Sequence, residues 1–540
     1  MTSQEFKSKA TALIDDLKGV CANYGLGNDG NEFKIITQVF LYKFINDKFA
    51  HEVKRIEPAL AKEKSWEDAL RKKSKDEFDL ILMQLGADTA RLKPEHFLST
   101  LWSKQNDKSF AEILDATLLD IAKLNADIFS VKTHDGQKIV LFDNVTQYVS
   151  SQRDAFAKAI INKLIPFSFE HIFAEKFDFY ATLFEYLIKD YNKDGGGKYA
   201  EYYTPHAVAK IMAACLVPKK VTNVTCYDPA AGSGTLLMNL AHAIGEDRCT
   251  IYTQDISQKS SSLLRLNLIL NNLVHSIPHV IQGNTILDPY HKEDSGAGLR
   301  KFDYIVSNPP FKLDFSDFRN QLDTKSNQKR FFAGIPKVSA KNKDKMAIYL
   351  LFIQHVIHSL SSNGRAAIVV PTGFITAQSG IEKGIRQHLV ENKMLGGVVS
   401  MPSNIFATTG TNVSILFIDA TNKEGVTLID ASSLGAKVKE GKNQKTLLCP
   451  NEESRIIQTF CRKEAIENFS VVVSYEEIAA KNYSLSAGQY FDVKVEHVEM
   501  TPKKFEMELA NRAGKLNALF GESRDLERQI SKQLSRLTHD

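Results

Sequence analysis

The chain has 540 residues, of which 43% are hydrophobic and 24% charged, so it has the composition of an ordinary globular protein and the length of several domains. Its six cysteines are scattered without a C-x-x-C pair, which argues against a disulfide framework or a zinc site, and no metal site is predicted. No apolar run reaches the length of a membrane span and the first residues carry no apolar signal segment, so we expect a cytoplasmic location without membrane contact.

The first part of the chain is predicted to be mostly helical. Apolar residues recur at three- and four-residue steps, as in Phe33, Ile36 and Phe40. Strand-like alternation is limited to a short segment at residues 138–142. We therefore expect an N-terminal α-helical domain over residues 1–165, with linking helices up to about residue 190.

Three consecutive glycines at residues 195–197 interrupt the helical pattern, because they lose too much backbone entropy to lie inside a helix or strand. Beyond them, short β-branched runs precede helical stretches. These runs are residues 224–227, 249–253, 280–281, 304–306, 366–370, 397–400 and 413–418. The alternation predicts an α/β fold with a mostly parallel sheet covered on both faces. We assign it to residues 166–480.

Residues 481–540 are predicted to form a C-terminal helical segment. From Lys503 onward, Leu516, Leu519, Leu526 and Ile530 lie near heptad spacing among many charges. A helix that packs on the chain's own core and a helix that pairs with a partner's helices both fit this pattern.

A glycine-rich segment, Asp-Pro-Ala-Ala-Gly-Ser-Gly at residues 228–234, follows the first strand of the predicted sheet and leads into a helix. Ligands of open parallel sheets bind at the carboxyl ends of the strands, and glycines there allow close approach to helix N–H groups. The segment matches neither G-x-G-x-x-G nor a P-loop. It indicates cofactor binding, although an ordinary glycine turn is the alternative.

Polar residues end the next two strands. Asp255 is placed to accept hydrogen bonds from ribose hydroxyls, or alternatively to cap the following helix. Asn284, in Gly-Asn-Thr after the third strand, is placed to contact an adenine ring. Both residues are therefore candidate cofactor ligands.

The segment Asn308-Pro309-Pro310-Phe311 follows the fourth strand and carries the predicted chemistry. Two prolines fix the backbone and remove its donors, which leaves rigid carbonyl acceptors beside the side-chain oxygen of Asn308. Two acceptors can hold a planar NH2 group and turn it into a nucleophile for the sulfonium methyl of S-adenosylmethionine. Phe311 offers a ring face for a base removed from its duplex. The alternative is a strand-ending turn with a packed phenylalanine.

Two flanking segments have both a structural and a functional interpretation. Thr204 as N-cap and Pro205 as first helical residue predict a helix start.

Residues 312–345 carry nine lysines and arginines against four aspartates, which suits contacts to DNA phosphates but also a merely solvated loop. The net charge of +4 is small, so any DNA-binding charge must be local.

Together these segments resemble the modification (methyltransferase) subunit of Type I restriction-modification systems, an N6-adenine DNA methyltransferase family. The resemblance rests on residues 33–49, 202–205, 228–234 and 308–311, and it continues through 363–371 and 406–417. It implies a Rossmann-like S-adenosylmethionine-dependent methyltransferase core. The implied catalytic residues are Asn308, Pro309, Pro310 and Phe311. The implied cofactor-binding residues are Glu201, Tyr202, Tyr203, Thr204, Pro205, His206, Asp228, Ala230, Gly232, Ser233, Gly234, Asp255 and Asn284.

Asp255 and Asn284 depart from the family pattern, which often has Glu at the first position and an acidic residue at the second. The resemblance also implies partners: double-stranded DNA, a specificity subunit, a second copy of the methyltransferase subunit and a restriction subunit that can join them. The C-terminal helix from Lys503 is the implied contact with the specificity subunit. No segment resembles a target-recognition domain, so sequence choice is expected from that partner.

Two other functions remain open from the sequence. Asn-Pro-Pro-aromatic motifs also occur in enzymes that methylate amines of RNA or protein, although those resemble this chain only across the core. A non-catalytic scaffold that holds DNA and a specificity subunit is the alternative from another class. The intact motifs at residues 228–234 and 308–311 argue against the scaffold.

Overall fold

The computed structural model describes residues 3–27, 30–173, 204–296, 298–338, 341–406, 412–440, 443–491 and 501–534. These residues belong to two units, one spanning residues 1–490 and the other residues 491–540. The predicted boundaries at residues 165 and 480 do not coincide with this division and stay predictions.

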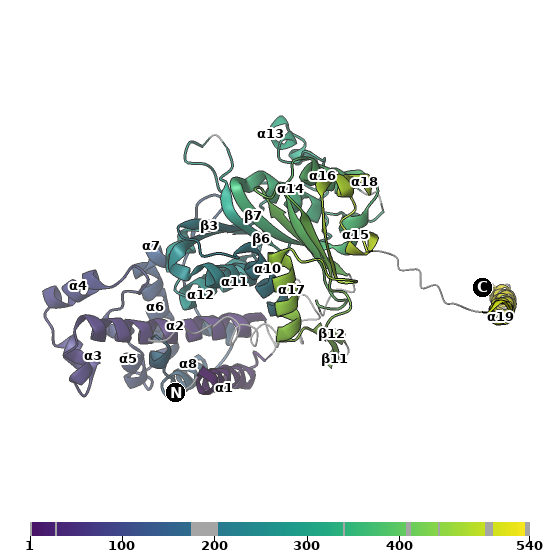
Figure 1. Ribbon diagram of the computed structural model, residues 1–540. Helices are drawn as coiled ribbons and strands as arrows, with labels where there is room; N and C mark the ends of the chain where they lie inside the picture. The colour runs from purple at the N-terminus through teal and green to yellow at the C-terminus, as the bar shows by residue number, and fades with distance from the viewer. Residues whose placement is uncertain are drawn as a thin grey trace. The chain divides into compact units, whose positions relative to one another are not determined.

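Helices dominate the first unit as far as residue 173, as the apolar spacing predicts (Figure 1). They are α1 (Ser3–Asn23), α2 (Gly30–Ile56), α3 (Trp66–Arg71), α4 (Lys75–Gln84), α5 (Leu98–Ser103), α6 (Phe110–Leu124), α7 (Ala126–Phe129) and α8 (Arg153–Leu164). Helix α4 begins with a capping box in which Ser74 and Glu77 each bond the other's backbone N–H. Helix α2 is buried along much of its 27 residues, because the other helices pack around it.

A sheet of 11 strands forms the centre of the first unit, in the order β13-β10-β8-β9-β7-β6-β3-β4-β5-β1-β2. Its strands are β1 (Val131–Thr133), β2 (Lys138–Ile139), β3 (Val224–Asp228), β4 (Cys249–Asp255), β5 (Val280–Gln282), β6 (Phe302–Ser307), β7 (Leu360–Pro371), β8 (Leu395–Ser400), β9 (Val413–Asp419), β10 (Val426–Asp430) and β13 (Ser470–Val473). From β7 through β6, β3, β4 and β5 to β1 all pairs are parallel, which confirms the predicted mostly parallel sheet.

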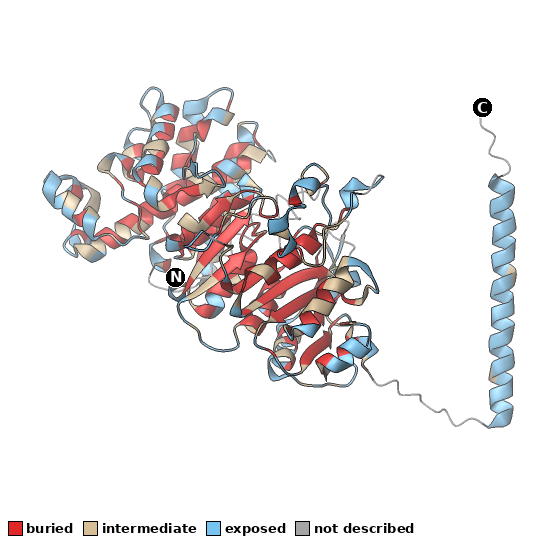
Figure 2. Ribbon diagram, turned by 90° about the horizontal axis from the view of Figure 1, so that it is seen from above, coloured by how far each residue is buried: buried red, intermediate tan, exposed pale blue. Residues whose placement is uncertain are grey.

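Helices cover both faces of the sheet, so the central strands are buried on both sides (Figures 1 and 2). Helices α10, α11 and α12 cover one face, and α14 and α16 cover the other. The helices of this region are α10 (His206–Leu216), α11 (Thr235–Ile244), α12 (Gln258–Leu270), α13 (Lys325–Gln328), α14 (Tyr349–Ser359), α15 (Thr372–Thr376), α16 (Gly380–Glu391), α17 (Pro450–Arg462) and α18 (Tyr475–Ala480). A separate hairpin consists of β11 (Ala436–Glu440) and β12 (Asn443–Leu447).

The N-terminal helices are joined to the sheet by hydrogen bonds as well as by apolar packing. Strand β1 pairs in parallel with β5, so the small β1–β2 hairpin extends the sheet. The buried guanidinium of Arg265, on α12, donates to the carbonyl oxygens of Phe129, Ile139, Val140 and Leu141 at 2.9 to 3.3 Å. One continuous apolar cluster also runs from α1 and α2 into α10, α11 and α12.

The second unit contains helix α19 (Pro502–Leu534), which begins one residue from its predicted start. None of its residues is buried, and its apolar side chains are exposed, as Figure 2 shows along its length. Among the described residues of both units, no helix is both long and apolar enough to cross a membrane.

Candidate active site

The glycine segment forms a tight turn between β3 and α11. Gly232 and Gly234 have φ angles of 53° and 86°, in the left-handed region that favours glycine. A Cβ atom on Gly234 would clash with Cδ1 of Leu264, and the positive φ angle also disfavours any larger residue there. The Ser233 carbonyl accepts a 2.7 Å hydrogen bond from Asn267 on α12. The glycine segment therefore forms a narrow turn, which places its own backbone and the start of α11 at the carboxyl edge of the sheet.

Two carboxylates hold this turn against the strands. Asp228 accepts a 2.9 Å bond from the Ala230 N–H, and burial raises the pKa of Asp228 to about 8. Asp255, at the end of β4, accepts from Gly232 N–H at 2.9 Å and from Ser257 N–H at 2.8 Å. Burial also raises the pKa of Asp255. Asp255 therefore positions the turn, and each of its oxygens keeps a lone pair for a ribose hydroxyl.

Asn284 lies in the turn after β5. Its side-chain oxygen accepts from the N–H groups of Ile286 and Leu287 at 3.0 and 3.1 Å, so the amide shapes this turn. The neighbouring Thr285 hydroxyl donates to the Pro229 carbonyl at 2.7 Å and ties the turn to the glycine segment. The adenine contact expected of Asn284 stays a prediction. The two bonds above use only the side-chain oxygen of Asn284, and its NH2 group takes no part in them.

Ile256 is a residue that the sequence interpretation missed. It follows Asp255 directly and is 65% exposed, although it is a large apolar side chain at the carboxyl edge of the sheet. An exposed apolar face beside Asp255, the carboxylate predicted to bind a ribose, suits the flat face of an adenine ring. The only sequence signal was an isoleucine immediately after a strand-ending aspartate.

The segment from Asn308 to Phe311 leaves the sheet at the end of β6, beside β3. Pro309 is buried and Pro310 is exposed, so the backbone turns outward between them. The partly exposed Asn308 amide nitrogen donates a 3.2 Å bond to the Thr204 hydroxyl. The half-buried Phe311 ring meets Tyr349 of α14 edge-on, with centroids 6.2 Å apart. Asn308 is thus held at the edge of the sheet with its carbonyl oxygen left for a ligand.

The expected role of Thr204 as a helix N-cap is wrong. Helix α10 begins at His206 after Pro205, and no side chain caps its first turn. Thr204 is buried and its hydroxyl bonds Asn308 instead, because a long-range partner replaces the local one. The buried Nδ1 atom of His206 has no hydrogen-bond partner among the described residues.

The described candidate residues gather at one edge of the sheet, at the carboxyl ends of the neighbouring strands β6, β3, β4 and β5. Bonds from Gly232 to Asp255, from Thr285 to Pro229 and from Asn308 to Thr204 join their segments. These residues fit S-adenosylmethionine, which needs a tight glycine turn, a ribose acceptor and an apolar adenine face. Three candidates, Glu201, Tyr202 and Tyr203, lie outside the described residues.

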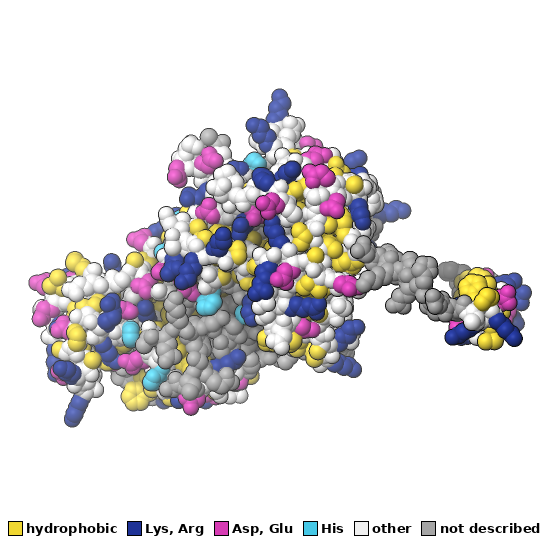
Figure 3. All heavy atoms as spheres, in the orientation of Figure 1, with side chains coloured by type: hydrophobic (Ala, Val, Ile, Leu, Met, Phe, Trp, Pro, Cys, Tyr) yellow, Lys and Arg dark blue, Asp and Glu magenta, His cyan; other side chains and the backbone are white. Residues whose placement is uncertain are grey.

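The basic insert after Phe311 has a small core of its own. Phe315, Leu322 and Phe331 pack against Leu351 and Phe352 of α14. Its exposed cations are Lys312, Lys325, Lys329, Lys337, Lys341, Lys343 and Lys345. Figure 3 shows Lys and Arg side chains gathered at the projecting tip that α13 forms.

Arg330 differs from the other basic residues of the insert. It is 2% exposed, lies 4.3 Å over the Phe331 ring and donates to the Ile286 carbonyl. Its guanidinium anchors the insert beside Asn284 and is not placed for a phosphate. Arg330 therefore does not belong to the exposed cations of this segment.

Comparison with a solved structure confirms the fold. The crystal structure of the type I restriction-modification system methyltransferase subunit from Streptococcus thermophilus has a TM-score of 0.68 to this chain at 22% identity, and the match covers 91% of this chain and 100% of that one. The fold is therefore that of a Rossmann-like S-adenosylmethionine-dependent methyltransferase with an N-terminal helical region and a C-terminal helix.

Sequence comparison gives the family. The chain belongs to the N-6 DNA methylase family, whose model matches residues 175–499. It is 29% identical over 337 residues to the Type I restriction enzyme MpnII methylase subunit of Mycoplasma pneumoniae, covering 60% of this chain and 59% of that protein. It is 26% identical over 395 residues to the MjaIX methylase subunit of Methanocaldococcus jannaschii, covering 70% and 66% respectively. The chain thus spans less than two thirds of the length of either relative.

Proposed function

We propose that this chain is the methylating subunit of a Type I restriction-modification complex and transfers a methyl group from S-adenosylmethionine to the N6 amine of adenine in DNA. The observation that carries the proposal is the bond from the Asn308 amide nitrogen to Thr204. An amide whose NH2 is occupied presents its carbonyl oxygen, and that oxygen accepts from an exocyclic amine.

Asn308 and the backbone of the proline segment activate the amine by position. The Asn308 side-chain oxygen and the Pro309 carbonyl each accept one proton of the adenine NH2 group, while Phe311 supports the face of the extruded base. Two acceptors draw the amine lone pair out of conjugation and point it toward the methyl group. S-adenosylmethionine supplies an electrophilic methyl on a positively charged sulfur. The N–C bond forms as the S–C bond breaks, which leaves S-adenosylhomocysteine, and the methylated nitrogen releases one proton to solvent, since the neutral Asn308 amide is not a base.

The residues at the neighbouring strand ends hold the cofactor. Asp255 accepts from the ribose, Ile256 packs on one face of the adenine, and the turn at Gly232 and Gly234 admits the remainder of the molecule. Asn284 and His206 supply further polar contacts from the two sides of this edge. The remaining predicted cofactor ligands Asp228, Ala230 and Ser233 shape the turn itself.

The proposed partners bind to surfaces that lie outside this edge of the sheet. The exposed lysines of the insert contact DNA phosphates next to the base pocket. The apolar stripe of α19 pairs with helices of a specificity subunit, which selects the DNA site, and a second copy of this chain acts on the other strand. A restriction subunit can join the resulting complex.

Methyl transfer from tritiated S-adenosylmethionine tests the proposal. The full chain with its specificity partner should label adenine in DNA and leave RNA and protein unlabelled. Asn308→Ala should abolish labelling while cofactor binding stays measurable, and Asn451→Ala, an exposed asparagine on α17, should leave both unchanged. Full labelling by Asn308→Ala would contradict the mechanism. Labelling of RNA or protein instead of DNA would identify a different acceptor, and failure to bind S-adenosylmethionine would favour a scaffold.

A further inference from the structure

Two cysteines meet at the packed helices α10 and α17, away from the proposed methyl-transfer site. Cys215 on α10 is buried and Cys461 on α17 is exposed, and both line one cavity of about 340 Å³. The Cys461 sulfur lies 3.9 Å from the carbonyl oxygen of Ala214, the residue before Cys215. Each of the two thiols shifts the pKa of the other. The accessible sulfur is therefore paired directly with a buried one.

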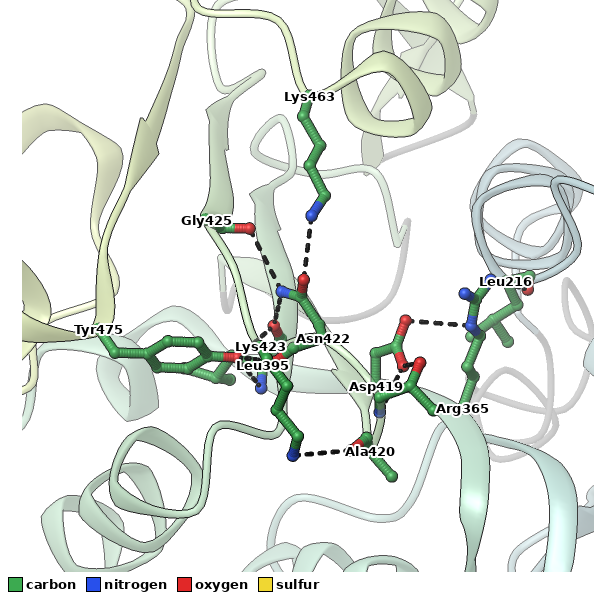
Figure 4. A network of polar contacts seen from close by, with 11 residues as sticks. Leu216, Arg365, Leu395, Asp419, Ala420, Asn422, Lys423, Gly425, Lys463 and Tyr475 are labelled. Atoms are coloured by element: carbon green, nitrogen blue, oxygen red, sulfur yellow. Dashed lines mark hydrogen bonds and ion pairs between the residues drawn. The ribbon is translucent and has the colours of Figure 1, made fainter.

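A fixed cation faces this thiol pair. Arg365 on β7 is held by a 3.0 Å ion pair from its Nε to Asp419 and by a 3.5 Å bond from Nη1 to the Leu216 carbonyl (Figure 4). The other charged residues lining the cavity are Asp419, Lys423, Glu424 and Lys463. Lys463 donates at 2.9 Å to Asn422, which keeps its amine beside the cavity. Arg365 is the cation whose charge acts on Cys461.

These contacts divide the two sulfurs into a reactive one and a shielded one. The hydrogen bond from Cys215, together with the Arg365 charge, lowers the pKa of Cys461 to about 7 although partial burial opposes this change. Burial raises the pKa of Cys215. At neutral pH a substantial fraction of Cys461 is thus the thiolate, which is the nucleophilic form, and Cys215 is the thiol.

The sheet contains a second thiol pair that serves as an internal comparison. Cys226 on β3 and Cys249 on β4 are also hydrogen-bonded to each other, but both are buried. The bond to Cys249 and burial raise the pKa of Cys226. Both sulfurs of this pair are buried, so the pair should not react with peroxide in the folded chain.

We propose that Cys461 and Cys215 form a peroxide-reactive dithiol, in which Cys461 is the attacking sulfur and Cys215 the resolving one. The Cys461 thiolate attacks hydrogen peroxide, the O–O bond breaks, and Cys461 becomes a sulfenic acid as hydroxide leaves. The Cys215 sulfur then attacks the Cys461 sulfur, the S–O bond breaks, and water leaves with the Cys215 proton. The two sulfurs lose two electrons, and the peroxide is reduced to one hydroxide and one water; the hydroxide becomes water by taking up the proton that Cys461 released when it ionised.

The resulting disulfide would join α17 to the end of α10. Helix α10 starts at His206, two residues after Thr204, so the dithiol and the Asn308 contact lie at opposite ends of one helix. The proposal does not depend on the chemistry of the methylated substrate, because it rests on the thiols and on Arg365 alone.

Peptide mass spectrometry of the full-length chain tests the dithiol. After treatment with stoichiometric hydrogen peroxide at neutral pH and alkylation of the remaining thiols, we expect a Cys215–Cys461 disulfide peptide. Cys449, which is also exposed, should still be alkylated, and Cys226 and Cys249 should be alkylated once the chain is unfolded. Absence of the disulfide peptide, or oxidation of Cys449 before Cys461, would overturn the proposal.

Single substitutions separate the roles of the two sulfurs. Cys215→Ser should stop the reaction at the Cys461 sulfenic acid, which a 1,3-dicarbonyl probe traps. Cys461→Ser should give neither the disulfide nor a trapped Cys215. Trapping of Cys215 in Cys461→Ser at the wild-type rate would show that Cys215 reacts by itself and would refute the assignment.

The role of Arg365 has its own readout. Arg365→Gln should shift the midpoint of Cys461 alkylation to higher pH and slow disulfide formation several-fold at pH 7, whereas Arg365→Lys should keep most of the rate. An unchanged midpoint in Arg365→Gln would show that the Arg365 guanidinium does not affect the ionisation of Cys461.

Discussion

The Asn308 side-chain nitrogen donates a 3.2 Å hydrogen bond to the Thr204 hydroxyl, and this bond joins two motifs that lie 104 residues apart in the chain. One motif follows β6 and the other precedes α10. With the amide nitrogen turned toward Thr204, the side-chain oxygen of Asn308 is left for a ligand.

Thr204→Val should therefore lower the rate of methyl transfer about tenfold, which corresponds to the loss of a hydrogen bond worth roughly 1.4 kcal/mol. Thr204→Ser keeps the acceptor and should keep most of the rate. Single-turnover kinetics with saturating S-adenosylmethionine separates this effect from a change in cofactor affinity. Equal rates for the valine and serine variants would show that the bond does not orient Asn308.

Asp228 gives the folded chain a pH dependence, because burial raises its pKa to about 8. Between about pH 4, where the unfolded carboxyl loses its proton, and pH 8, the folded chain holds a proton that the unfolded chain does not. The free energy of unfolding should therefore fall as pH rises through this window, by up to about 1.4 kcal/mol per pH unit.

Asp228→Asn should flatten this decline, since the amide is neutral at every pH and still accepts from Ala230. Denaturant unfolding at a series of pH values measures the slope. Asp317→Asn, at an exposed position in the insert, is the matched control and should follow the wild-type profile. Parallel profiles for wild type and Asp228→Asn would contradict a protonated Asp228.

Arg265 should be a main determinant of the junction between the N-terminal helices and the sheet. Arg265→Met keeps the length of the side chain but removes the donors to Phe129, Ile139, Val140 and Leu141. Leaving buried carbonyls without donors should cost about 3 kcal/mol of unfolding free energy. The same change at Arg248, on the surface, should cost less than about 0.5 kcal/mol.

Hydrogen exchange locates the Arg265 effect. The amides of β1 and β2 should lose protection in Arg265→Met, while those of β8 and β9 should not. A uniform loss over all strands would mean that Arg265 stabilises the whole unit and not the junction.

The sequence predicted the central strands well and the edges of the sheet poorly. Buried parallel strands such as β6 and β7 have continuous apolar runs, which a pattern search detects. The parallel pairing of β1 with β5 connects Lys132 to Ile281, and no local pattern encodes a partner so distant. The strands β10 and β13, which lie at one side of the sheet, were not predicted, and they are only five and four residues long.

The candidate site shows the same division between local and long-range information. The glycine turn and the Asn-Pro-Pro-Phe segment were recognisable because their conformations are set within a few residues. The partner of Thr204 was not, since the local Thr-Pro pattern predicts a cap and only the fold brings Asn308 near it. Arg330 is buried, unlike the exposed lysines beside it, and Ile256 is exposed although it is a large apolar residue. The residue type alone predicts neither of these degrees of burial.

The exposed lysines at the tip of the insert should contribute to DNA affinity through phosphate contacts. Lys325→Ala with Lys329→Ala should weaken binding by similar factors for different DNA sequences and reduce the salt-dependence slope by about 2. Fluorescence anisotropy of the complex over a range of salt concentrations measures both quantities. Lys437→Ala with Lys439→Ala, on β11, removes the same charge elsewhere, and an equal change in slope would show that the insert has no special role.

Helix α19 should carry the contact with the specificity subunit through its apolar stripe. Leu519→Glu with Ile530→Glu places two charges in that stripe, at side chains that are 60% and 55% exposed in the single chain. Burying unpaired charges in a helix interface should weaken assembly at least tenfold, because each charge must lose its hydration. Ser523→Glu with Gln529→Glu adds the same charge at polar positions of the helix. Co-purification of the full chain with its specificity subunit compares the two variants. If both pairs reduced assembly equally, net charge and not the apolar stripe would be the cause, and if neither did, the contact would lie outside α19.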